Sequence, residues 1–133
     1  MITQRNYEPK RKHNFVVEFN GINIEPFVVQ YITLPKLINN KWDDITISCI
    51  DLVPISTAKI LYQFYKENKK KWFSQKPIFD ITVSMLDPTS VEIEKWYISV
   101  KKIKEIDFGY CSYNVDNANE IIIIIEPLNC KLI

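Results

Sequence analysis

Apolar and polar side chains alternate along much of this chain, which is the pattern of β-strands that bury one face. The clearest pair of predicted strands is 79–86 and 91–100, two apolar-rich runs on either side of Asp87-Pro88-Thr89-Ser90. Proline has its φ preset for the second position of a turn, and the carboxylate of Asp87 can accept a hydrogen bond from a nearby backbone N–H. The sequence therefore predicts a β-hairpin here, with Trp96 as its largest apolar anchor.

The pattern predicts further strands before this hairpin. Residues 15–19 alternate, and Asn20-Gly21 after them is a strong signal for a tight turn, so we expect residues 15–19 to pair with the run that starts at Ile22. Residues 27–52 look like a long hairpin with a protruding tip at 35–41, where Asn39-Asn40 forms the turn. A protruding hairpin has little core of its own and needs a neighbour to pack against.

The pattern also predicts one helix and two C-terminal strands. Apolar residues at 60, 61, 64 and 65 follow helical spacing after a capping serine or threonine at 56–57. Residues 101–108 continue the hairpin strand, and five successive isoleucines at 121–125 predict a last strand that is covered on both faces. The sum favours a mainly β fold, an antiparallel β-sandwich or barrel with one flanking α-helix.

Composition narrows the function classes. A chain of 133 residues with 47% hydrophobic residues predicts a single domain, 1–133, with residues 1–13 as an extended N-terminal arm. A net charge of +1 gives no general attraction to nucleic acids or membranes, and the longest purely apolar run, 121–125, is too short to span a bilayer. Two glycines exclude glycine-rich phosphate loops.

The inventory of reactive side chains is small. The single histidine, His13, lies in a polar stretch, and the three cysteines show no C-x-x-C spacing, so we expect a surface histidine and small core or interface thiols. Glu92 and Glu94 are expected to share a strand face. Paired carboxylates can act in acid–base catalysis, but a solvated strand face is the favoured interpretation. The sequence thus predicts neither an enzyme nor a metal or cofactor site.

Three short elements recur in order in the second half of the chain: Leu86-Asp87-Pro88-Thr89, Glu94-Lys95-Trp96 and Asp107-Phe108-Gly109. This series resembles the C-terminal half of the tail tube proteins of contractile-tailed bacteriophages. Residues 11–19 are similar to the first strand of that family, and Trp42, Ile45-Thr46-Ile47 and Asp51 are similar to a later one. Ser90 stands where the family usually has glycine, and the glycine expected before Ile103 is missing.

The resemblance implies a β-sandwich with one flanking helix, shared with type VI secretion tube proteins. It also implies hexameric rings that stack into a tube, which conducts phage DNA during ejection. The location would be the tail of the virion, after assembly in the host cytoplasm, with sheath, baseplate and tape-measure proteins as partners and no membrane. The alternatives are a baseplate tube initiator or a neck or tube-terminator protein of the same fold, and, in a different class, a monomeric β-barrel binding module.

The resemblance also suggests roles for particular residues. The tip of the 27–52 hairpin would be a ring-stacking arm, made of Pro35, Lys36, Leu37, Asn39, Asn40, Lys41 and Trp42. Acidic residues that face the lumen would repel passing DNA, and the candidates are Glu18, Glu92, Glu94 and Glu126.

Overall fold

The computed structural model describes residues 14–52, 55–71, 75–114 and 117–133. The expectations for the arm 1–13 and for His13 lie outside these residues. The strands are β1 (Phe15–Asn20), β2 (Val29–Ile32), β3 (Leu37–Ile38), β4 (Lys41–Trp42), β5 (Ile45–Ile50), β6 (Phe79–Leu86), β7 (Glu92–Asp107) and β8 (Glu120–Leu132). The helices are α1 (Thr57–Asn68) and the short 3₁₀ turns Pro26–Val28 and Lys69–Lys71.

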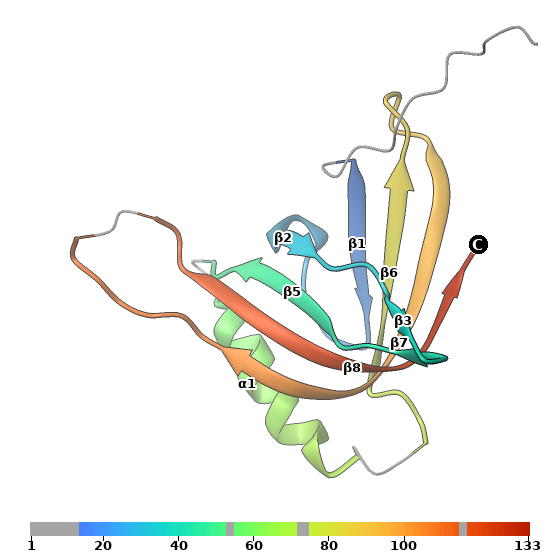
Figure 1. Cartoon of the computed structure of the whole chain (residues 1–133). Helices are drawn as coiled ribbons and strands as arrows, with labels where there is room; N and C mark the ends of the chain where they lie inside the picture. Colours follow the sequence, from blue (N-terminus) through green and yellow to red (C-terminus); the bar gives the residue numbers. More distant parts are fainter. Residues whose placement is uncertain (1–13, 53–54, 72–74, 115–116) are drawn as a thin grey trace, which may run out of the picture.

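Six strands form one antiparallel sheet in the order β1-β6-β7-β8-β5-β2, and β3 pairs with β4 separately. The two longest strands, β7 and β8, shift register three times between Ser99 and Glu105. Bulges of this kind bend a strand and increase its twist. Figure 1 shows β7 and β8 curving from the leaf with β1 and β6 to the leaf with β5 and β2. The sheet is therefore a nearly closed barrel, which confirms the predicted fold class.

The isoleucines of β8 fill the space between the leaves. Ile121, Ile123 and Ile125 are buried and lie opposite Cys49, Ile47 and Ile45 of β5, which are also buried. On the other face of β8, Ile122 and Ile124 are half-buried. The isoleucine run is thus fully covered on one face and partly covered on the other.

The predicted helix is confirmed as α1. The side chain of Ser56 caps it by accepting a hydrogen bond from the N–H of Lys59 at 3.2 Å. Leu61 and Phe64 are buried, and the ring of Phe64 meets Phe79 of β6 edge-on, with 5.3 Å between ring centroids. The helix therefore contributes its apolar stripe to the same core as the sheet.

The predicted hairpin at Asn20-Gly21 is wrong. β1 pairs with β6, with Val17 opposite Val83, and the chain after β1 runs irregularly into the 3₁₀ turn 26–28. Gly21 does make a turn, with φ +100°, and its backbone passes close to Phe79, where an added Cβ would lie 3.3 Å from the Cβ of that residue. After this turn the chain does not pair with β1 but continues to the 3₁₀ turn 26–28.

Trp96 provides a test of how the core is anchored. It is half-buried, and its ring meets Trp42 edge-on with centroids 6.1 Å apart. Because full burial is absent, we expect Trp96→Ala to lower the free energy of unfolding by roughly 2–3 kcal/mol, below the ~3–5 kcal/mol of a fully buried tryptophan. Chemical denaturation measures the change.

The neighbouring Tyr97 is the matched control, because it lies on the opposite face of β7 and is exposed. Tyr97→Ala should change the free energy of unfolding by about 0.5 kcal/mol or less. Equal losses in the two variants would contradict the orientation of β7.

Candidate assembly surfaces

The turn between β6 and β7 is held by a single carboxylate oxygen. Oδ1 of Asp87 accepts hydrogen bonds from the N–H of Thr89, the hydroxyl of Thr89 and the N–H of Val91, at 2.7–2.9 Å. The N–H of Ser90 donates to the carbonyl of Asp87, and Ser90 then takes φ +67°. This is a type I turn followed by a left-handed residue. Ser90 therefore adopts the backbone conformation that glycine favours at such a position.

The segment 107–109 fastens the loop that follows β7. Oδ1 of Asp107 accepts a hydrogen bond from the N–H of Gly109, and the carbonyl of Phe108 accepts one from the side-chain amide of Asn119, both at 2.9 Å. Gly109 has φ +88°, and a Cβ there would collide with the side chain of Asn119. Together with the turn at 87–90, these contacts explain structurally why the sequence carries these motif residues.

An apolar groove separates the two outermost strands of the sheet. β1 and β2 each have one hydrogen-bonded neighbour, and their other edges are free of pairing within the part of the chain that the structure describes. The groove between them, here called the edge groove, has a volume of about 1050 Å³ and is lined by residues of β1, β6 and the segment 26–34. Phe27, Tyr31 and Leu34 on this segment are exposed by 72%, 44% and 43%. An apolar surface of this kind is typical of an interaction site.

β3 and β4 form a small hairpin, here called the tip hairpin, with Asn39 and Asn40 at its turn. Both asparagines have positive φ, 50° and 62°, which is the geometry of a tight type I′ turn. Leu37 and Ile38 of β3 are exposed by 61% and 44%. The tip hairpin thus presents two exposed apolar side chains on β3, next to a turn that is already formed in the single chain.

The residues of the expected ring-stacking arm divide into two groups. Lys36, Leu37, Asn39, Asn40 and Lys41 are exposed, whereas Pro35 and Trp42 are half-buried. The ring of Trp42 lies against Trp96 and so anchors the tip hairpin to the sheet. A partner would therefore contact the exposed residues of the arm. The contact of Trp42 with Trp96 sets the position of these residues relative to the sheet.

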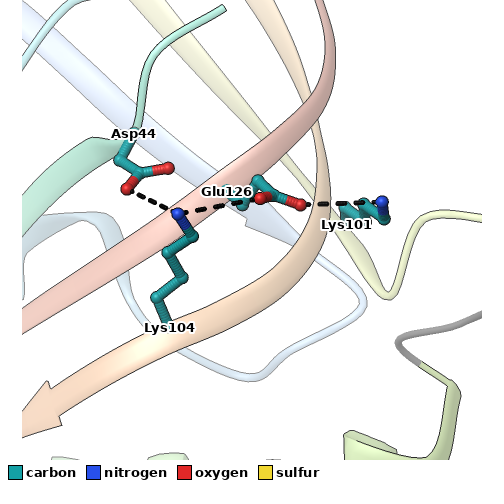
Figure 2. Close-up of polar contacts among 4 residues, drawn as sticks. All are labelled: Asp44, Lys101, Lys104 and Glu126. Carbon is teal, nitrogen blue, oxygen red and sulfur yellow. Dashed lines mark hydrogen bonds and ion pairs between the residues drawn. The ribbon is translucent and has the colours of Figure 1, made fainter.

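A chain of ion pairs fastens the base of the tip hairpin to the sheet (Figure 2). Nζ of Lys104 lies 3.0 Å from Oδ2 of Asp44, the residue just before β5, and 3.7 Å from Oε1 of Glu126. Oε2 of Glu126 lies 3.7 Å from Nζ of Lys101. The hydrogen bond to Asp44 is the main cause that raises the pKa of Lys104, and the charges of Asp44 and Glu126 add to it.

The four candidate lumen acids do not gather on one surface. Glu18 is exposed and lies opposite Thr82, whereas Glu92 lies opposite Leu86, four residues and about 13 Å further along β6. Glu126 is neutralised by Lys101 and Lys104, and Glu92 lies 3.7 Å from Lys95. Glu18 makes no ion pair with any described residue.

The expectation that Glu92 and Glu94 share a strand face is wrong. Glu94 lies opposite Met85 and Glu92 opposite Leu86, with a register shift between them. Met85 and Leu86 are consecutive residues of β6 and point to opposite faces of the sheet. The bulge therefore places the two acids beside opposite faces, and no paired carboxylate site results.

The described residues hold little reactive chemistry. Burial raises the pKa of the Cys49 thiol to about 12 and that of Cys130 to about 11, so both thiols are protonated at neutral pH. Cys111 is exposed. Among the described residues there is no group of three or more His, Cys, Asp or Glu that could hold a metal ion. None of the described helices is long and apolar enough to cross a membrane.

Sequence reasoning found the tip hairpin but missed the edge groove. The run 27–34 was recognised as strand-like, yet its partner across the groove is β1, and which strands become edges depends on the order of the whole sheet. Phe27 and Tyr31 gave the one available signal, because large apolar residues beside a proline at position 26 fit an edge strand.

No family model matches the sequence, and no curated protein matches it. Solved structures do match. A chain of the sheath/tube terminator of an extracellular contractile injection system, PVC, in the extended state aligns with TM-score 0.70 and 11% identity, over 97% of this chain and 99% of that one. A chain of the tube-terminating cap of the anti-feeding prophage aligns with TM-score 0.67 and 12% identity, over 99% and 95%. A chain of the anti-feeding prophage baseplate aligns with TM-score 0.63 and 10% identity, over 96% and 97%. At these identities the likeness shows a shared fold.

Asp87 makes the β6–β7 turn sensitive to pH. Hydrogen bonds from the hydroxyl of Thr89, from the N–H of Val91 and from the N–H of Thr89 lower the pKa of Asp87 below 3.8. The stabilisation is therefore fully present above that value and is lost as the pH falls through the depressed folded-state pKa. We expect Asp87→Asn to be less stable than the wild type at neutral pH, and the difference to shrink in strongly acidic solution.

Denaturation curves measured from about pH 7 to about pH 2 check this expectation. Asp43→Asn is the control, because Asp43 is also exposed and its described hydrogen bond uses the backbone N–H. A stability difference for Asp87→Asn that stays constant over this range would argue against the proposed role of the carboxylate.

Lys104 should matter for the tip hairpin more than for the whole fold. Lys104 is exposed and its partners are only half-buried, so we expect Lys104→Gln to lower the free energy of unfolding by less than about 1 kcal/mol, with a smaller loss at high salt. Amide hydrogen exchange should speed up in residues 36–44 and stay unchanged in β6. Lys131→Gln, at a lysine without an ion pair to a described residue, is the control. Unchanged exchange at 36–44 would show that the ion pairs do not hold the tip hairpin.

Proposed function

We propose that this chain is a structural subunit of the tube of a contractile, phage-tail-like particle, where it forms hexameric rings that stack into a conduit. The observation that carries the proposal is the pair of strand edges on either side of the apolar edge groove that have no partner among the described residues. A fold shared with chains of the contractile assemblies named above supports it.

The physical reason for assembly is the state of the sheet border. Unpaired backbone N–H and C=O groups along β1 and β2 can pair with another strand, and exposed apolar side chains beside them favour a protein neighbour over water. Copies of one chain that bind head to tail through two different surfaces form a ring if the rotation closes. A ring built in this way satisfies both surfaces on every subunit.

The tube would carry DNA without binding it. Glu18 makes no ion pair with a described residue, so a lumen on that side of β1 would repel phosphate groups. Sheath, baseplate and tape-measure proteins would contact the outer and end surfaces. In this proposal the chain performs no catalysis.

A tube terminator or a baseplate tube initiator is the second candidate. The similar structures favour it, because they come from a sheath/tube terminator, a tube-terminating cap and a baseplate. Such a subunit would form the same ring but stack on one side only. The two candidates therefore differ in how many rings associate and agree in the architecture of one ring.

Native mass spectrometry and negative-stain electron microscopy of the purified chain, at rising concentration, test the proposal. Hexameric rings that stack into tubes are the expected result for a tube subunit, and single rings that do not extend are expected for a terminator or initiator. A chain that stays monomeric at every concentration would overturn both and favour a monomeric binding module.

The same measurement tests the ring-stacking arm. Deleting residues 35–41 should leave the subunit folded and block stacking, because the exposed apolar tip is lost while Trp42 stays on Trp96. A variant with Gly and Ser at the same seven positions keeps the chain length and should also fail to stack. Normal tubes from both variants would contradict the assignment of the arm.

A further inference from the structure

The edge groove is a large apolar concavity, and its size and lining favour a segment of protein over a small ligand. Its volume of about 1050 Å³ lies at the upper limit of the ~300–1,000 Å³ that small-molecule sites occupy. Such sites also need several convergent polar groups, whereas Gln30 and the hydroxyl of Tyr31 are the polar side chains in this lining. The groove therefore suits a segment of protein.

The borders of the edge groove restrict the shape of that segment. β1 forms one border and β2 the other, and each has a free edge. An extended peptide beside a free edge gains main-chain hydrogen bonds, and its alternate side chains enter the apolar space. An occupant with at least one extended strand and two or more apolar side chains fits both requirements.

The chain itself carries a segment with these properties, the tip hairpin. Its outer strand, β3, pairs with β4 on one side and has a free edge on the other. Leu37 and Ile38 on β3 are exposed, and the left-handed Asn39 and Asn40 hold the turn in shape before any partner binds. A preformed segment loses less conformational entropy on binding than a flexible one.

The tip hairpin of the same subunit is held elsewhere. The ring of Trp42 packs on Trp96 of β7, and Asp44 at its base is ion-paired with Lys104. Both contacts place it over β7 and β8, which lie between the edge strands in the order of the sheet. The hairpin that fills the groove must then come from another copy.

Charge on the two surfaces is complementary. Lys36 and Lys41 flank the exposed side chains of the tip hairpin. Glu25 directly precedes Pro26 of the groove lining. All three side chains are exposed, so their attraction would steer the orientation and the rate of encounter more than the affinity.

We propose that the tip hairpin of one copy of this chain binds in the edge groove of a second copy, with β3 along a free strand edge and one of its two consecutive side chains, Leu37 or Ile38, in the apolar space. The inference rests on the proposed assembly into rings or stacks and names the segments that make the contact. The two surfaces differ, so the contact is head to tail and each copy can give one hairpin and receive another.

Disulfide trapping between two single-cysteine chains tests the contact. One chain carries Ile38→Cys and the other Phe27→Cys, both with Cys111→Ser, because Cys49 and Cys130 are buried. Mixed under a mild oxidant, they should form a cross-link between copies. Ile55→Cys replaces Phe27→Cys in the control, since Ile55 is 69% exposed and lies at the start of α1, away from the groove lining. The expected yield is at least about tenfold higher for the pair 38–27 than for 38–55.

Two substitutions on the tip hairpin give an independent measurement. Leu37→Asp and Ile38→Asp change exposed residues, so the subunit should keep its circular dichroism spectrum and melting temperature, while self-association weakens at least about 30-fold. Ile55→Asp is the matched control and should associate like the wild type. Lys41→Glu should slow association, and mixing it with Glu25→Lys chains should restore the rate.

The outcomes separate this inference from the proposed function. If the wild type forms rings or tubes but the pair 38–27 cross-links no better than 38–55, the contact is made elsewhere and the proposed function stands. If the Leu37→Asp and Ile38→Asp chains assemble like the wild type, the inference is likewise overturned. If the wild type is monomeric at every concentration and no cross-link forms, both fail.

Discussion

The antiparallel pairing of β7 with β8 is the interaction on which the rest of this structure depends. The two strands run together through both leaves of the sheet, and the register shifts between Ser99 and Glu105 bend them from one leaf to the other. The bend brings Ile103 and Ile125 into one core with residues of β5 and β6. β1 and β2 lie at the two ends of the strand order, on either side of this central pair. They are therefore the edge strands of the sheet.

Subunit stability and the proposed assembly use different side chains. Most of the core consists of buried side chains on β5 to β8, joined by Val17 of β1 and by Ile22, Ile24 and Val28 and closed on one side by Leu61 and Phe64 of α1. The apolar residues offered to a partner, such as Phe27 and Leu37, lie on the segments between β1 and β5 and are exposed in the subunit. A substitution at the border can therefore change association while the fold survives, which makes the proposed contacts open to experiment.

The sequence correctly predicted the elements that depend on interactions between residues close together in the chain. Asp87 and Pro88 specify the turn between β6 and β7, and Ser56 with the apolar stripe after it specifies α1. The partner of β1 could not be predicted in the same way. Asn20-Gly21 favours a hairpin with the residues that follow, whereas pairing with β6 buries Val17 opposite Val83. In the structure β1 pairs with β6. The edge groove and the faces of Glu92 and Glu94 depend on strand order and on bulges, which no short stretch of sequence specifies.

The edges of β1 and β2, which have no strand partner among the described residues, also have a consequence for the chain on its own. A free strand edge beside exposed apolar side chains is a template for indiscriminate strand addition, which leads to aggregates instead of an ordered particle. Natural sheets block such edges with charge, and Glu18 on β1 and Gln30 on β2 give only modest protection here. If the proposed assembly is correct, chains made in excess of their partners would be prone to aggregate, and balanced synthesis of the components would limit this loss.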